Sequence, residues 1–446
     1  MKEKLRVLLT LASSVTVVLF LASLAVGAHL FFQVPMNMEI LLSEPLESPH
    51  PYPATGWEER LALRLPRLAL KIAVALEEND ALIVEDVSSG AKWIYNSTKP
   101  GNKTYVLTDV FYANTSGYVD LRISIVDDGD GETAWGIRVA RVITDIWPLR
   151  FIPYLIIALV FVPLPPVPAW VLAAFLLALF IALLVVSAVS GGGFHRAVLR
   201  GHVRPLSYSL RNFLYAMPFI STALLTGIMG LTWLLERSGI GAAYRGELPG
   251  ALVFTLEASY AAVVEEVGFR LILIGIPLAL AALMKTSGWV EYGERHLFLK
   301  ALLCPSAISP RLRRELRSIA WALVLITSAV FGIAHVLAGT WEVGKAITAS
   351  LAGLVMGACF VEYGLHASIL LHWFFNYHIQ IWWALYELYP HSLSVLLAVN
   401  LVFLYELILG ALSLLVFLVQ GLRLALYRRR AKREQALGLM WGYKRW

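Results

Sequence analysis

Long apolar stretches with few charges alternate with short basic segments along most of the chain. Each apolar stretch approaches the roughly 20 residues that a helix needs to cross a bilayer. The expected spans are 7–32, 209–235, 250–283, 318–339, 343–361, 366–388 and 394–422, with a further stretch at 148–190. That further stretch is long enough for two short passes and is broken by four prolines between Pro163 and Pro168.

Residues 33–150 follow a different pattern. The segment 46–53 is rich in proline, and polar and apolar residues alternate from Tyr118 to Val126, which is typical of half-buried strands. The run Asp127–Glu132 resembles a calcium loop, but the rest of that pattern is missing and its Asp-Gly pairs also fit a hairpin turn. At roughly 115 residues, the segment is large enough for one small β-rich domain.

Basic residues next to the spans predict the topology. The positive-inside rule places both termini and the loops 191–208 and 284–317 in the cytoplasm, which requires an even number of passes. Counting 148–190 once gives eight passes and leaves 33–150 outside, with the part before the prolines at the outer interface. Three glycosylation sequons, at Asn96, Asn102 and Asn114, are compatible with that placement.

Composition agrees with a membrane protein. Hydrophobic residues make up 58% of the 446 residues, charged residues only 15%, and the mean hydropathy is +0.68. Residues 33–150 hold 17 acidic and 11 basic side chains, although the whole chain has a net charge of +6. The excess of basic residues lies beside the spans, where the positive-inside rule accounts for it, so we expect no nucleic-acid partner.

Cysteine usage excludes some classes of site. The chain has two cysteines, Cys304 in a basic loop and Cys359 in an apolar span. The sequence contains no CxxC pair that would indicate a redox site or a zinc ribbon. Neither cysteine lies in 33–150, so we expect no disulfide in that segment.

Three charges lie inside the span 250–283: Glu265, Glu266 and Arg270. Each costs about 2.5–3.5 kcal/mol at a helix centre, so each needs a partner or a function. Arg270 follows Glu266 by four residues and is predicted to pair with it on one helix face. Glu265 points about 100° away and is left to face a cavity as a general base. A purely structural charge network between helices is the alternative.

Later spans bring further polar groups to membrane depth. His335 is the only ionisable group in the apolar part of its span, while His372 and Asn376 are four residues apart on one face of another span. Taken singly, His335 fits a hydrogen-bonded core residue, and the other two fit polar contacts between helices. His366 and His378 fall near span ends or on other faces. Straight helices would separate His335 and His372 by about 10–15 Å in height.

Together, these residues form three motifs in order on separate helices. The sequence Glu265-Glu266-x-x-x-Arg270 is followed by Phe331-x-x-x-His335 and then His372-x-x-x-Asn376. This order resembles the CPBP family, which contains CAAX proteases and bacteriocin-processing enzymes. The stretches Gly353–Gly357, Tyr363–Leu365 and Ser368–Leu370 also resemble the run into that family's last motif. The resemblance covers roughly residues 206–390.

The resemblance implies an intramembrane endopeptidase acting on a membrane-associated or lipid-modified protein in contact with membrane lipid. By the same resemblance, Glu265 and His335 activate water, and His372 and Asn376 stabilise the oxyanion. Two histidines and a glutamate also match a known catalytic zinc set. We prefer a metal-free mechanism, because Asn376 beside His372 fits a pair of donors better than a ligand set.

We therefore predict an all-α polytopic membrane helical bundle of about eight transmembrane helices with a small extracytoplasmic β-rich domain. The expected parts are a signal-anchor helix at 1–32, the β-rich domain at 33–150, a span and basic loop at 151–208, the CPBP-like core at 209–390, and a last span with a basic tail at 391–446.

Two other functions remain open. A membrane scaffold or immunity protein would keep the fold without proteolysis, and the intact motif set argues against it. A transporter would use the buried charges as a path, but repeated halves with broken helices are not evident. The segment 33–150 lies outside the family's motif region, and the loop 284–317 exceeds the usual length, so each addition is a candidate for substrate recruitment.

Overall fold

The computed structural model describes most of the chain. After residue 149 the described ranges are 150–157, 160–201, 206–244, 251–286, 296–339, 341–389 and 392–442. Before that point they are 2–32, 39–43, 58–64, 69–76, 81–87, 90, 92–96, 104–107, 111–112, 118–126 and 136–142. The predicted acidic turn Asp127–Glu132, the proline-rich segment 46–53 and two sequons, Asn102 and Asn114, lie outside these ranges.

Seven helical segments within the described ranges are long and apolar enough to cross a membrane. They belong to α1 (Lys2–Phe32), α2 (Ala169–Val189), α5 (Phe213–Arg237), the continuous run of α6 (Ala251–Glu266), η1 (Val267–Gly275) and α7 (Ile276–Thr286), α9 (Pro310–Leu337), α10 (Gly344–Tyr363) and α13 (Leu393–Gly442). The helical bundle that the sequence predicts is therefore confirmed.

The eighth expected pass, 366–388, is helical but differs in character. It consists of α11 (Leu365–Trp373), the π-helical segment η4 (Phe374–His378) and α12 (Ile379–Leu388). Three histidines and Asn376 make it less apolar than the seven segments above. A count of eight passes therefore remains a prediction.

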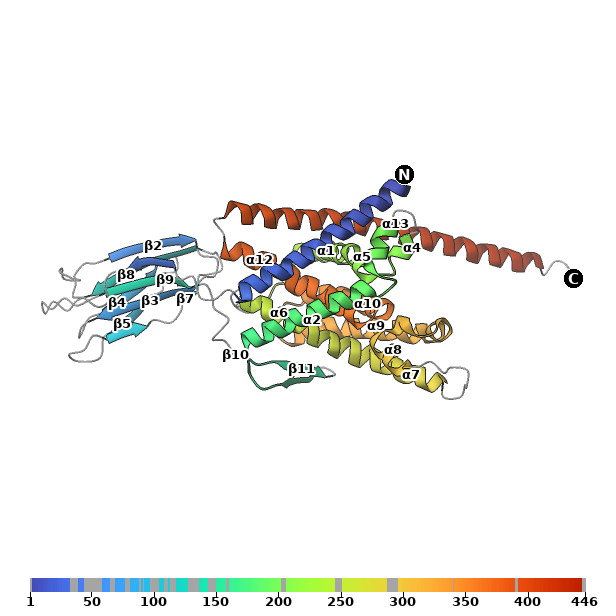
Figure 1. The fold of residues 1–446 in the computed structure, drawn as a ribbon, viewed down its shortest axis with the longest axis horizontal. Helices are drawn as coiled ribbons and strands as arrows, with labels where there is room; N and C mark the ends of the chain where they lie inside the picture. The colour runs from blue at the N-terminus through green and yellow to red at the C-terminus, as the bar shows by residue number, and fades with distance from the viewer. Residues whose placement is uncertain are drawn as a thin grey trace.

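Short helices connect the long ones at one end of the bundle. Helices α3 (Phe194–Arg200) and α4 (Leu206–Ser209) lie between α2 and α5, while α8 (Leu297–Leu303) and η3 (Pro305–Ala307) precede α9. The side chain of Asn212 caps the N-terminus of α5 by accepting a hydrogen bond from the Tyr215 N–H, 3.2 Å away. These connections, the N-terminus and the C-terminal part of α13 lie at the end of the bundle away from the large sheets (Figure 1).

Strands in the first third of the chain pair into two antiparallel sheets beyond the other end of the bundle (Figure 1). One sheet has the order β1-β9-β3-β6, with β7 also paired to β3, and the other has the order β2-β8-β4-β5. The strands are β1 (Glu39–Ser43), β2 (Glu58–Arg64), β3 (Ala69–Leu76), β4 (Ala81–Asp86), β5 (Lys92–Asn96), β6 (Thr104–Leu107), β7 (Phe111–Tyr112), β8 (Tyr118–Val126) and β9 (Gly136–Val142).

Strand β8 coincides with the alternating stretch in the sequence. Its residues Leu121, Ile123 and Ile125 are buried, and Arg122 and Ser124 between them are partly exposed. This alternation is expected for a strand that packs one face against a hydrophobic core. The strand predicted at Tyr118–Val126 is therefore confirmed.

The stretch 148–190 contains one helix and two small hairpins. Its prolines precede α2, which begins at Ala169 and forms a single pass, as predicted. Before it, β10 (Arg150–Phe151) pairs with β13 (Val167–Pro168), and β11 (Tyr154–Ile157) pairs with β12 (Val160–Pro163). The sequence did not predict these strands. Their apolar residues resemble a helical span, but proline disfavours a helix interior.

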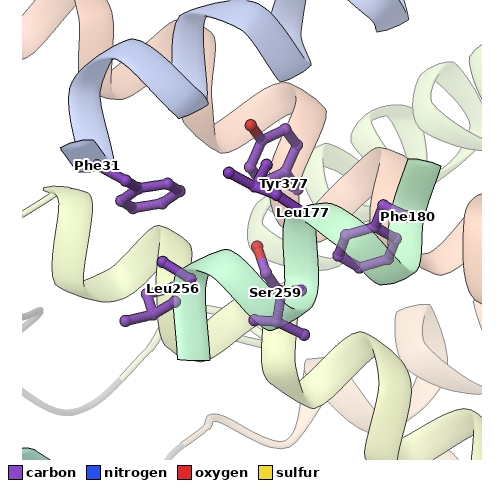
Figure 2. Close-up of a pocket in the computed structure, with 8 residues that line it drawn as sticks. Phe31, Leu177, Phe180, Leu256, Ser259 and Tyr377 are labelled. Atoms are coloured by element: carbon purple, nitrogen blue, oxygen red, sulfur yellow. The ribbon is translucent and has the colours of Figure 1, made fainter. Parts of the chain in front are cut away.

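Aromatic packing holds the first helices against the end of α11 and against η4. The Trp373 ring stacks on Phe180 of α2 at 3.4 Å and on Tyr377 at 4.4 Å between ring centroids. The Tyr377 hydroxyl donates to the Ser23 carbonyl of α1, 3.0 Å away. A cavity beside Tyr377, lined also by Leu256 and other apolar side chains, has space of about 10 Å³ (Figure 2). This is about the volume that one water molecule needs, so these helices are closely packed.

Glycines allow α9 and α10 to approach closely. A Cβ atom at Gly353 would lie 3.2 Å from the Ser328 Cα, and one at Gly357 would lie 3.0 Å from the Val324 side chain. On α9, a Cβ at Gly332 would lie 2.1 Å from the Ala346 carbonyl oxygen. Small residues four apart are typical of closely packed membrane helices. The contact fixes α9, which carries His335, against the start of α10.

Candidate active site

The acidic pair lies where α6 changes into the π-helical segment η1. Glu265 and Glu266 are the last residues of α6, and Arg270 lies in η1. Arg270 Nε is 3.2 Å from Glu266 Oε2, and both side chains are almost completely buried, with 1% and 0% exposure. The predicted Glu266–Arg270 ion pair is confirmed.

Glu266 is the centre of a buried network. Besides the contact with Arg270, it accepts a hydrogen bond from the Ser368 hydroxyl at Oε2. Its Oε1 lies 2.9 Å from His372 Nδ1, which donates to it. Because the carboxylate receives donors from two other groups as well as Arg270, its charge is compensated inside the bundle. Glu266 therefore orients His372 and leaves the other ring nitrogen, Nε2, toward Glu265.

Glu265 is less constrained than Glu266. Its side chain is 17% exposed, and its Oε2 lies 3.7 Å from His372 Nε2. Among the described residues, this oxygen has no hydrogen-bond partner, although it is buried. An unsatisfied buried carboxylate oxygen is costly unless another group completes its hydrogen bonding. The position suits a group that binds water or substrate.

Asn376 connects η4 to α6. Its Nδ2 donates to the Ala258 carbonyl at 2.9 Å and lies 3.2 Å from His372 Nε2. The predicted proximity of His372 and Asn376 on one face is confirmed. The bond to Ala258 also fixes which end of the amide faces His372, because only the NH₂ end donates.

His335 joins the same cluster through Phe331. Its Nδ1 lies 2.8 Å from the Phe331 carbonyl oxygen, which only accepts, so Nδ1 carries the proton and Nε2 is the remaining acceptor. The Phe331 ring lies 4.6 Å from the His335 ring and 6.0 Å from the His372 ring, between centroids. The Arg270 guanidinium lies over the same ring at 4.6 Å. Phe331 is therefore the shared contact of three predicted site residues.

The contacts with Phe331 limit the separation of His335 and His372. Their ring centroids lie 4.6 Å and 6.0 Å from the Phe331 ring, so the two histidine rings are at most about 11 Å apart, at or below the lower end of the range of about 10–15 Å in height that straight helices predicted. Helix α11 runs back alongside α10. Ser368 Oγ lies 3.1 Å from the Met356 carbonyl oxygen, well before the end of α10.

Tyr154, which the sequence reasoning missed, is close enough to Glu265 for that charge to act on its phenol, and Tyr260 holds Tyr154 in place. The Tyr260 hydroxyl of α6 contacts both backbone groups of Tyr154 in β11, accepting from its N–H at 3.1 Å and donating to its carbonyl. Burial, followed by the charge of Glu265, raises the pKa of the Tyr154 phenol above its usual value. The phenol therefore stays protonated at neutral pH. Gly268 lets the hairpin approach η1, because a Cβ there would lie 2.9 Å from the Ile156 backbone.

Other missed residues are Ser368, which contacts Glu266, and Lys345 at the start of α10. A signal for Lys345 was available, because it is a cation inside the apolar stretch 343–361. The hydroxyl of Ser368 gave no comparable signal, since serines bonded to their own helix are common in membrane spans. No sequence signal indicated Tyr154, because the stretch around it is mostly apolar.

A three-ligand zinc site does not fit the donor atoms as they are arranged. Within the part of the chain that the structure describes, no group of three or more His, Cys, Asp or Glu side chains is placed to hold a metal. His372 Nδ1 is bonded to Glu266, and its Nε2 faces the NH₂ group of Asn376. The amide NH₂ donates to the lone pair of His372 Nε2, so that lone pair is not available to a metal cation at the same time. The metal-free mechanism remains a prediction.

Comparison with known protein families gives a match to part of the chain. Residues 247–378 match the family model of type II CAAX prenyl endopeptidase Rce1-like proteins. The matched range contains Glu265, Glu266, Arg270, His335, His372 and Asn376. Neither the curated proteins nor the solved structures gave a match. The resemblance to the CAAX protease family is thus confirmed for this part of the chain.

Proposed function

We propose that this protein is an intramembrane endopeptidase that hydrolyses a peptide bond in a membrane-associated or lipid-modified protein. One observation supports it above the others. A free carboxylate, Glu265, faces a histidine, His372, whose other nitrogen is held by a buried carboxylate. Amide hydrolysis needs a base for water and donors for a tetrahedral oxyanion. The match to the CAAX prenyl endopeptidase family supports the same chemistry.

In the proposed mechanism, Glu265 accepts a proton from water while His335 Nε2 holds the same water. The resulting hydroxide adds to the carbonyl carbon of the scissile bond. In this mechanism His372 also carries a proton on Nε2 when substrate is bound, and Asn376 turns one N–H from Nε2 toward the oxyanion, so both side chains donate to it. The C–N bond then breaks, and the leaving amine takes the proton from Glu265. Glu266 and Arg270 hold His372 in place and take no proton.

A scaffold without proteolysis and a transporter remain the alternatives. Neither role requires a carboxylate oxygen that is buried without a partner beside an oriented histidine. A scaffold would be equally stable with that oxygen replaced. We therefore retain hydrolysis as the function that this geometry supports best.

Hydrolysis is tested with an S-farnesylated fluorogenic peptide ending in the C-a-a-X pattern, which prenylated proteins carry. Purified full-length protein in liposomes is expected to cleave it, with zinc absent from the preparation by elemental analysis and activity retained after chelation. A wild-type protein that cleaves no such peptide would contradict the proposed function. Stoichiometric zinc, lost in both His335→Ala and His372→Ala, would contradict only the metal-free mechanism.

The proposed placement is a multi-pass cell membrane protein with both termini in the cytoplasm and residues 33–150 outside. Figure 1 supports a common side for the basic segments, because α4, α8, the start of α1 and the C-terminal part of α13 lie away from the large sheets. Cysteine labelling of intact cells, in a variant lacking Cys304 and Cys359, is expected to reach a cysteine placed in β8 and to miss one placed at Arg430. Labelling of a cysteine at the Arg430 position from outside the cell would contradict the proposed orientation.

A further inference from the structure

Three consecutive residues of η4 each bind a different helix. Asn376 donates to a backbone carbonyl of α6 at 2.9 Å, and the Tyr377 hydroxyl donates to one of α1 at 3.0 Å. His378 Nε2 lies 2.7 Å from Glu406 Oε1 of α13. Because an ionised carboxylate only accepts hydrogen bonds, the imidazole is the donor in this contact. The turn that carries Asn376 is therefore fixed from three sides.

The backbone of η4 links His378 to Asn376. In this π-helical turn, the Ile379 N–H donates to the Phe374 carbonyl, five residues earlier. Asn376 and His378 both lie within the ring that this hydrogen bond closes. A shift of His378 therefore moves the widened turn, and Asn376 moves with it.

The contact between His378 and Glu406 is unfavourable inside an apolar bundle unless it has a function. Both side chains are completely buried. Among the described residues, His378 Nδ1 and Glu406 Oε2 have no hydrogen-bond partner. A buried pair that is only partly satisfied is often no more stabilising than apolar side chains of similar volume. Stability alone does not account for the pair, whereas fixing how helices meet is a known use of such pairs.

Aromatic rings surround the imidazole of His378. The Phe374 ring stacks on it at 5.1 Å, the Phe20 ring of α1 lies at 5.2 Å, and the Trp382 ring lies at 6.2 Å, between centroids. These rings fill the space around the imidazole. Its direction is held by the hydrogen bond to Glu406, so α13 determines how this end of η4 is oriented.

We propose that His378 and Glu406 are positioning residues, which hold η4 so that Asn376 presents an N–H to the oxyanion. The inference rests on the proposed hydrolysis and extends the site to α13, beyond the matched residues 247–378. Asn376 must turn one N–H away from His372 Nε2 while the amide stays bonded to α6. An oxyanion donor is effective at about 2.7–3.1 Å, and a misplacement of about 1 Å can lower the rate about 10²-fold.

His378→Met combined with Glu406→Met removes this contact without stranding a buried charge. Since apolar replacement of a buried pair is often neutral, this apolar double variant is expected to keep the thermal unfolding temperature of wild type. Its kcat for the farnesylated C-a-a-X peptide is expected to fall about 10- to 100-fold with KM nearly unchanged. His378→Gln keeps a donor for Glu406 and is expected to recover most of that loss.

Combination with Asn376→Ala separates positioning from a general loosening of the bundle. If the pair acts through Asn376, the apolar double variant lowers kcat no further once residue 376 is alanine. Tyr405→Phe serves as the matched control, because Tyr405 precedes Glu406 on α13 and donates to the Ala12 carbonyl of α1 at 2.8 Å. It removes another hydrogen bond of α13 and is expected to keep the wild-type kcat.

Four outcomes would overturn the positioning role and leave the proposed hydrolysis intact. The first two are an unchanged kcat in the apolar double variant and a loss of its folded protein, which would show that the pair serves the fold. The others are a further fall in kcat by the same factor in the Asn376→Ala background and an equal fall in Tyr405→Phe. A wild-type protein that cleaves no peptide would overturn the hydrolysis itself, and this inference with it.

Discussion

Glu265→Gln is expected to abolish peptide hydrolysis while the protein still folds. The change keeps the shape of the side chain and removes the base, which typically contributes about 10²–10⁴-fold to the rate. Glu265 is 17% exposed, and its Oε2 lies 3.7 Å from His372 Nε2, beyond hydrogen-bond distance, so its charge supports little of the fold. The measurement is the rate of cleavage of the farnesylated peptide, with the thermal unfolding temperature recorded on the same preparation.

The turnover of two further variants is compared with that of Glu265→Gln. Glu257→Gln changes an exposed carboxylate on the same helix, two turns earlier, and is expected to keep wild-type turnover. Asn376→Ala removes one oxyanion donor and is expected to lower kcat by about 10²–10³. Turnover near the wild-type level in Glu265→Gln would show that another group activates water. An equal loss in Glu257→Gln would show that the effect is not specific to the site.

The pairs within one helix could be predicted from the sequence because helical geometry fixes them. Residues four apart share a face, so the contacts Glu266–Arg270 and His372–Asn376 followed from spacing alone. The freedom of Glu265 followed from its 100° offset. The contact of Glu266 with His372 could not be predicted this way, because it joins two helices whose crossing is set by packing.

The parts that the sequence did not predict depend on tertiary contacts and on backbone irregularity. Both π-helical segments carry site residues, Arg270 in η1 and Asn376 in η4, and spacing does not reveal where a helix widens. The hairpin of β11 and β12 was hidden because Val, Ile and Phe suit strands and membrane spans alike. Tyr154 lies near the site because Gly268 allows that hairpin to approach η1.

Arg270→Ala is expected to reduce the amount of folded protein sharply, in contrast to Glu265→Gln. It leaves the Glu266 carboxylate fully buried without its cation, and stranding one partner of a buried pair typically costs about 3–5 kcal/mol. It also removes the guanidinium from the Phe331 ring. The measurement is the monodisperse fraction after purification together with the thermal unfolding temperature. Lys285→Ala breaks a half-exposed pair and is expected to cost at most about 1 kcal/mol.

A double variant separates the structural role of the pair from its role in catalysis. Glu266→Gln combined with Arg270→Met removes both charges, so no ion is stranded, and the glutamine amide keeps hydrogen-bonding groups for Ser368 and His372. The double variant is expected to recover most of the folded protein that Arg270→Ala loses. Its turnover is expected to stay low, because His372 Nδ1 then donates to a neutral amide oxygen and its imidazolium loses a charged partner. Full turnover in the double variant would mean that Glu266 and Arg270 serve the fold alone, and that Glu265, His335 and Asn376 position His372 without them.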